Sequence, residues 1–216
     1  MKNKGGYMTK SPRMNNDALL AAGLELVKQN GKLLTRRQGS GRAMLYALPN
    51  GDTVRVRTTN DHALIVVADQ PSPHNAKLNI EGTEWLLIVM PMVERTPGNV
   101  IAYLVPTAKA VAATRAEQQA WLDSQPNTAG KNTTWALYFG EKTPATATDF
   151  QDAWSAYRLP GDILIASDGT LVQAAEPGSA GEVGTIPAEV ETARQRIATS
   201  AGVSPAAVRI TIDFGV

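Results

Sequence analysis

The sequence predicts an α+β (mixed α/β) fold: a central, antiparallel-rich mixed sheet of about five strands flanked by two helices, with a small C-terminal helix-strand unit. Asn50-Gly51 separates two runs of strand-forming residues, which is the preferred arrangement for a β-hairpin. Further apolar runs of strand length follow, and stretches with helical periodicity lie before and after them. Together these patterns favour one sheet covered by helices.

The N-terminal elements are predicted from caps and turns. A first helix is expected over residues 17–29, with Asn16 as its N-cap and Asn30-Gly31 as its end. The polar stretch 31–41 is interpreted as a loop or a short strand. The hairpin then places its strands at residues 43–48 and 53–58.

The later elements follow from apolar runs and helical patterns. Three more strands are predicted at residues 63–68, 85–90 and 100–105. Pro106-Thr107 opens a helix to about Asp123, since proline is tolerated before the first helical turn. The remaining predictions are a strand at 135–139, a short amphipathic segment at 149–157, a strand at 163–166, a helix at 187–200 and a strand at 208–214.

Composition shifts suggest four parts along the chain. Residues 1–16 are expected to form a flexible basic arm, and residues 17–139 an α/β core domain. Residues 140–184 are rich in Thr, Ala, Pro and Gly and are interpreted as a linker-rich segment with a short helix and strand. Residues 185–216 form the C-terminal helix-strand unit, which needs a partner surface because one helix and one strand cannot bury a core.

Charge is distributed unevenly along the chain. The first 60 residues carry eleven Lys or Arg and three Asp or Glu, a net charge of +8, whereas the other 156 carry ten and seventeen, a net charge of −7. Such asymmetry points to a polyanionic partner, so DNA or RNA is expected. The alternative partner is another copy of the chain or another protein, with the basic region meeting the acidic remainder.

The candidate phosphate-contacting residues are arginines of the hairpin region. Arg55 and Arg57 lie two positions apart on a strand and therefore share one face, whereas Val54 and Val56 face the core. A guanidinium group matches the geometry of a phosphate, and its binding releases counterions. The predicted nucleic-acid-binding set is Arg36, Arg37, Arg42, Arg55 and Arg57.

Several functional classes find little support in the sequence. Cysteine is absent, so disulfides and thiolate metal sites are excluded. Asp61-His62 and His74 lack the spacing of a metal cluster, and no cofactor or metal is expected. No apolar run reaches the roughly 20 residues of a membrane span, and the basic N-terminus lacks a secretory apolar region. A cytoplasmic location without membrane association is therefore expected.

The order helix, hairpin, strand, followed by Glu84 to Val89 and by Ile101 to Thr107 before a helix, resembles the PD-(D/E)XK nuclease-like superfamily. The resemblance covers about residues 17–124 and implies a nuclease-like fold. Where that superfamily places a metal-binding Asp, this chain has Met44-Leu45-Tyr46, and where it places Glu-x-Lys, this chain has Arg55-Val56-Arg57. Arginines in place of carboxylates repel Mg²⁺, so the resemblance implies a catalytically degenerate member.

Three functions are thus open at this point. The first is a non-catalytic nucleic-acid-binding or accessory protein that contacts phosphates through its basic hairpin. The second is a protein-interaction module or a homo-oligomeric structural or regulatory protein. The third is a Mg²⁺-dependent endonuclease whose ligands come from Asp61, Asp69, Glu81 or Glu84.

Overall fold

Two long apolar strands form the centre of the fold. β5 (Trp85–Pro91) and β6 (Asn99–Pro106) pair in antiparallel register, with Ile88 opposite Tyr103. Both strands are buried on both faces because helices or further strands cover each side, which is why their sequences are nearly continuous apolar runs.

The structure is a computed structural model of the 216-residue chain. It describes residues 13–37, 44–125, 127, 132–140, 148–166, 168–172, 190–191, 193–195, 197–198 and 204–211. Contacts divide the chain into two units, Met1–Ala174 and Ala175–Val216.

Within the described residues, the central sheet has seven strands rather than the predicted five. Its order is β1-β2-β3-β5-β6-β8-β9, and only the β3–β5 pair is parallel. Four of the five predicted strands are in this sheet, and β1, β8 and β9 are additional members. β1 and β9 are two residues long and too short to show an alternating pattern, and β8 is the strand predicted at 163–166 within the linker-rich segment. The other bounds in this sheet are β1 (Thr35–Arg36), β2 (Leu45–Ala47), β3 (Thr53–Thr58), β8 (Ile163–Ile165) and β9 (Leu171–Val172).

The predicted hairpin is present, and Gly51 is the left-handed residue of its turn. β2 and β3 pair with Leu45 opposite Arg55. Among the turn residues Gly51 has a positive φ of 92°, whereas Asn50 does not. The Gly51 N–H donates to the Leu48 carbonyl at 2.9 Å, as in a type I turn followed by a left-handed glycine.

A second, two-stranded sheet lies outside the central one. β4 (Ala63–Val67) pairs in antiparallel register with β7 (Thr134–Tyr138), so the strand predicted at 63–68 is not part of the central sheet. Alternate residues Leu64, Val66 and Leu137 face the core, and Ile65 and Val67 face outward with 44% and 45% exposure. The apolar run alone indicated a strand and carried no information about its partner.

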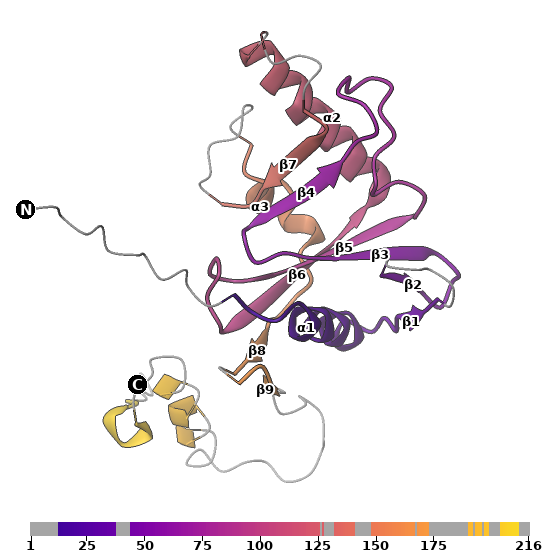
Figure 1. Ribbon diagram of the computed structural model, residues 1–216. Helices are drawn as coiled ribbons and strands as arrows, with labels where there is room; N and C mark the ends of the chain where they lie inside the picture. Colours follow the sequence, from indigo (N-terminus) through magenta and orange to yellow (C-terminus); the bar gives the residue numbers. More distant parts are fainter. Residues whose placement is uncertain are drawn as a thin grey trace, which may run out of the picture. The chain divides into compact units, whose positions relative to one another are not determined.

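Helix α1 (Asn16–Gln29) covers one face of the central sheet (Figure 1). Its N-cap is Asn15, one residue before the predicted cap, and the Asn15 side chain accepts a hydrogen bond from the Asp17 N–H. Leu19, Ala22, Leu26 and Val27 pack on Val54, Val56, Leu87, Val89, Ala102 and Ile163 of the sheet.

The opposite face of the sheet is covered by β4, β7 and the helices α2 (Thr107–Ser124) and α3 (Phe150–Ala153) (Figure 1). Phe139, Phe150 and Trp154 form an aromatic cluster with Tyr103, at ring-centre distances of 4.8 to 6.4 Å. A short 3-10 helix, η2 (Ser155–Tyr157), leads from α3 towards β8. The described residues 148–166 and 168–172 of the expected linker therefore contribute Phe150 and Trp154 of the aromatic cluster, together with β8 and β9, to the first unit.

The second unit is described over fewer residues. The described positions between 190 and 198 are helical, within the range predicted for a helix. A 3-10 helix, η3, spans Pro205–Ala207. Residues 208–211 are not in a strand, contrary to the prediction for 208–214, and the rest of that range lies outside the described residues. Within the described part of the chain, no helix combines the length and the apolar character that crossing a membrane requires.

Candidate phosphate-binding cleft

A cleft of about 530 Å³ opens beside the end of β3. It lies between β3, the start of β4 and the residues that lead into α1. Its lining includes three arginines, one aspartate and apolar side chains, among them Arg13, Arg55, Arg57, Asp61, Met44 and Ile65. We call this feature the arginine cleft.

Strand periodicity directs two arginines towards the arginine cleft. Val54 and Val56 are fully buried against α1, so Arg55 and Arg57 lie on the opposite face of β3. Both are half-buried, which is uncommon for arginine. The prediction that Arg55 and Arg57 share one face while Val54 and Val56 face the core agrees with the β3 geometry.

The described contacts of these two guanidinium groups are with carbonyl oxygens. Arg57 Nη2 donates to the Ile65 carbonyl at 2.7 Å, and Arg55 Nη2 lies 3.5 Å from the Glu81 carbonyl. The Arg55 Nε is buried and has no hydrogen-bond partner. Within the described residues neither arginine forms an ion pair. The described residues supply carbonyl dipoles to these two cations and no carboxylate that pairs with them.

The electrostatics of the pair reflect this arrangement. Burial, followed by repulsion from Arg55, holds the pKa of Arg57 below its ordinary value. Arginine stays protonated even so, because its unperturbed pKa is far above neutral pH. An anion in the arginine cleft would relieve both the desolvation and the like-charge repulsion.

The remaining charged residues of the cleft belong to one small network. Asp61 binds Arg13 at 3.3 Å and Arg95 at 2.5 Å, and the hydrogen bond to Asp61 raises the pKa of Arg95. With three arginines and this aspartate, the cleft lining carries a net charge of +2. Asp61 is thus engaged by Arg13 and Arg95, and its described ion pairs do not include Arg55 or Arg57.

A buried asparagine fixes the wall of the cleft next to α1. Asn60 is 7% exposed. Its side chain accepts a hydrogen bond from the Met14 N–H at 2.9 Å and donates one to the Met14 carbonyl at 3.0 Å. This reciprocal pair ties the chain before α1 to the β3–β4 connection, and it places Arg13 at the rim of the cleft.

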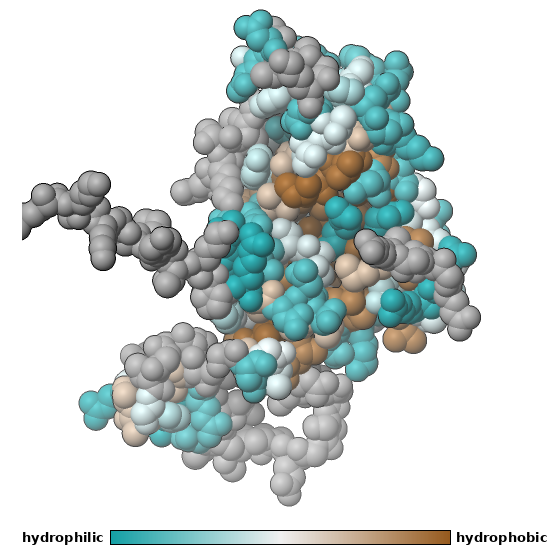
Figure 2. All heavy atoms as spheres, viewed as in Figure 1, coloured by the Kyte–Doolittle hydropathy of each residue, from teal (hydrophilic) through white to brown (hydrophobic). Residues whose placement is uncertain are grey.

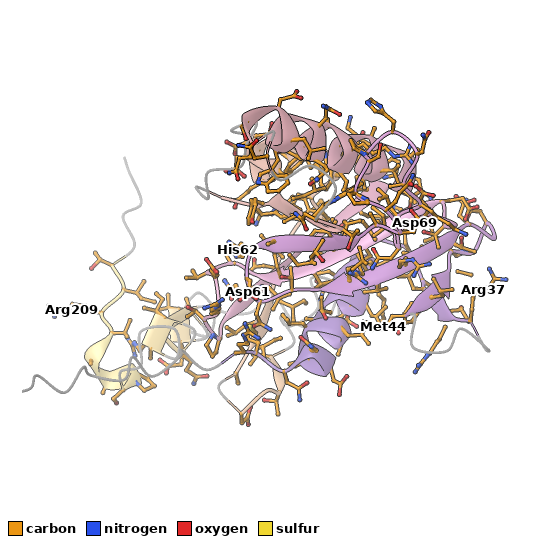
Figure 3. All side chains as sticks on the ribbon, turned by 45° about the horizontal axis from the view of Figure 1, so that its top comes forward. Arg37, Met44, Asp61, His62, Asp69 and Arg209 are labelled. Carbon is orange, nitrogen blue, oxygen red and sulfur yellow. The ribbon has the colours of Figure 1, made fainter. Side chains whose placement is uncertain are left out.

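The other predicted arginines are dispersed. Arg36 pairs with Tyr46, which pairs with buried Val54, so Arg36 lies on the α1 face of the sheet, away from the arginine cleft. Arg37 comes directly after β1, and its N–H donates to the carbonyl of Leu45, which pairs with Arg55. Arg37 therefore lies on the same face of the sheet as Arg55, two strands away. Figure 3 shows Arg37 at the far edge of the sheet from Asp61. Arg42 lies outside the described residues.

The carboxylates proposed as metal ligands have other contacts. Glu81 binds Arg115 at 3.0 Å, Glu84 accepts hydrogen bonds from Thr53, and Asp69 accepts one from the Lys77 N–H at 2.8 Å. His62 lies 2.6 Å from the Pro91 carbonyl through its Nε2. Across the described residues, no three His, Asp or Glu side chains gather into a group that could hold a metal ion.

Sequence reasoning missed Arg13 as a member of the site. The prediction for residues 1–16 places Arg13 in a flexible arm, because sequence position gives no sign that Asn60, 46 residues after Met14, holds Met14 in place. The nearby Asn15-Asn16-Asp17 cap signal could have shown that the ordered chain begins close to Arg13.

Comparisons of the chain with known proteins give no relative that could indicate the role of the arginine cleft. No protein-family model, curated protein or solved structure matches the chain.

Proposed function

We propose that the protein is a non-catalytic nucleic-acid-binding or accessory protein that contacts phosphates in the arginine cleft. The observation that carries the proposal is the half-buried pair Arg55 and Arg57, which has no carboxylate partner among the described residues. Buried charges in proteins are ordinarily paired, and an unpaired pair of like charges is costly. A phosphate would supply the missing anion.

The chemistry of the two side chains favours phosphate over other anions. Each guanidinium group offers a planar fork of N–H donors, which matches the oxygens of a phosphate in a bidentate arrangement. Arg57 donates one hydrogen bond, from its Nη2, to the Ile65 carbonyl, and the buried Nε of Arg55 has no hydrogen-bond partner among the described residues. Donors therefore remain for a ligand at both residues.

The shape of the cleft suggests how a strand is held. Its volume of about 530 Å³ lies within the range of ligand pockets, roughly 300 to 1,000 Å³. A cleft of this size accommodates a short segment of a phosphodiester backbone. Arg13, 61% exposed at its side chain, lies at the rim and can contact a neighbouring phosphate.

Binding assays with paired substitutions test the proposal. We expect the double variant Arg55→Gln/Arg57→Gln to bind a fluorescent oligonucleotide more weakly, by about 10- to 150-fold for each arginine. The reason is that a hydrogen bond to a charged group contributes about 1.5 to 3 kcal/mol. Fluorescence anisotropy at constant ionic strength measures the dissociation constants.

A matched control comes from the same sheet. Arg36→Gln removes the same charge from the opposite face, so it should change affinity by less than about threefold, in line with a distant screened charge. Urea unfolding verifies that each variant is folded. Equal affinities of the wild type and the folded double variant would refute the role of the arginine cleft.

A further inference from the structure

A second, smaller hollow lies between α2 and β7. Its volume is about 120 Å³. Three of its eight lining residues are aromatic, namely Trp121, Trp135 and Tyr138, and the others are Glu117, Gln118, Asn132, Thr134 and Ala136. A cavity of about 150 Å³ accommodates a benzene molecule, so this aromatic hollow has the size of a single six-membered ring.

The polar groups of the aromatic hollow are suited to an uncharged ring. Gln118 is 4% exposed, and its Nε2 is buried without a hydrogen-bond partner. A buried donor without an acceptor is destabilising, and a ligand carbonyl would satisfy it. Glu117, 7% exposed, also lines the hollow and disfavours a phosphate there. Trp135 Nε1 is satisfied by the Asn132 carbonyl at 3.0 Å.

The aromatic hollow adjoins the arginine cleft across one pair of strands. Ile65 lines the cleft, Ala136 lines the hollow, and these residues are direct partners in the β4–β7 pair. Paired residues in an antiparallel sheet have side chains on the same face, about 5 Å apart. The outer face of β4 between them exposes Ile65 and Val67, and Figure 2 shows apolar atoms over β4.

We propose that this face binds single-stranded nucleic acid, with phosphates in the arginine cleft and a pyrimidine base in the aromatic hollow. This inference rests on the proposed function. It adds that the bound nucleic acid is single-stranded and that one of its bases contacts the aromatic hollow. A base has a flat face that can stack on aromatic side chains and carbonyl oxygens that can accept from Gln118. A duplex cannot bind in this way, because its bases are stacked and paired.

Oligonucleotides with and without bases separate the two contacts. The probes are a fluorescent oligothymidylate and a strand of equal length with abasic sites throughout. Stacking contributes about 1 to 3 kcal/mol per base, so the wild type should bind the oligothymidylate about 5- to 150-fold more tightly than the abasic strand. Trp121→Leu and Gln118→Leu should each reduce this ratio and leave affinity for the abasic strand unchanged.

Gln119→Leu is the matched control, because Gln119 lies on the same helix and binds Asp123 at 2.8 Å, outside the hollow. It should keep the wild-type ratio. Equal affinity of the wild type for both strands would overturn the base contact while the phosphate cleft stands. Absence of binding to either strand would overturn the proposed function as well. Gln118→Leu tests the hollow even where Trp121→Leu does not fold.

Discussion

Arg55 and Arg57 differ from ordinary surface arginines in their surroundings. They are half-buried next to each other, and their described contacts are carbonyl oxygens instead of carboxylates. The period of a strand was enough to predict their common face. Their burial and lack of an ion pair depend on β4 and on the Glu81 loop, which approach from elsewhere in the chain, so the sequence pattern could not reveal them.

Tyr103 shows a different kind of unpaired polar group. Its side chain is 0% exposed, its hydroxyl has no hydrogen-bond partner, and burial raises its pKa. Tyr103→Phe removes a desolvated hydroxyl and keeps the ring packing on Phe139. We therefore expect the free energy of unfolding in urea to stay within about 1 kcal/mol of the wild type, or to rise. A clear loss of stability would show that the hydroxyl has a bonding partner.

Glu84 gives the fold a pH-dependent contact. Its carboxylate accepts hydrogen bonds from the Thr53 hydroxyl and, at 2.6 Å, from the Thr53 N–H, and these bonds lower its pKa. Because the pKa of Glu84 is lowered, the charged carboxylate stabilises the folded state when the pH is above the ordinary pKa of 4.5. This contribution is lost as the pH falls through the pKa of the folded state.

Urea unfolding of Glu84→Gln at two pH values tests this contact. The variant should be less stable than the wild type at pH 7, and the difference should be smaller at pH 3, because protonation below the ordinary pKa of 4.5 progressively removes the charge that the folded state stabilises. A difference of the same size at both pH values would mean that the charge of Glu84 does not contribute.

At the scale of elements, α1 approaches the sheet closely at Gly23. A methyl group at this position would lie 2.3 Å from Val89 Cγ2, and Val89 is fully buried. Gly→Ala in a helix ordinarily stabilises by about 0.5 to 1 kcal/mol. Here we expect Gly23→Ala to destabilise the protein by about 1 to 3 kcal/mol, because the stiff valine cannot yield easily.

A double-mutant cycle in urea isolates that contact. Val89→Ala makes room, so the combination Gly23→Ala/Val89→Ala should be less destabilised than the sum of the single variants, by about 1 kcal/mol or more. Additive effects would contradict a direct clash between the helix and β5.

The predictability of the elements followed the strength of their local signals. Helix α1, the β2–β3 hairpin and the long strands β5 and β6 carry caps, a glycine turn or continuous apolar runs, and each was predicted near its observed bounds. The pairing of β4 with β7 joins residues about 70 positions apart, and no local pattern indicates it. The same holds for the aromatic hollow, which depends on that pairing.

At the scale of the whole molecule, the basic residues that give the first 60 positions their excess of positive charge do not all gather in the arginine cleft. The basic residues of the first 60 positions are spread over several surfaces: Arg36 lies on the α1 face of the sheet, and Lys28 of α1 pairs with Glu25 at 3.5 Å. Among the described basic residues of the first 60 positions, Arg13, Arg55 and Arg57 line the arginine cleft and the others do not. Placement in the fold therefore says more about binding than the total charge does.

The salt dependence of oligonucleotide binding is the most direct test of this account. Three phosphate contacts predict that the logarithm of the association constant falls with the logarithm of salt concentration with a slope of about −2, since each contact to a single strand contributes about −0.7. The Arg55→Gln/Arg57→Gln variant should show a slope of about −0.7, and Arg36→Gln should keep the wild-type slope. An identical slope for the wild type and the double variant would contradict a phosphate site in the arginine cleft.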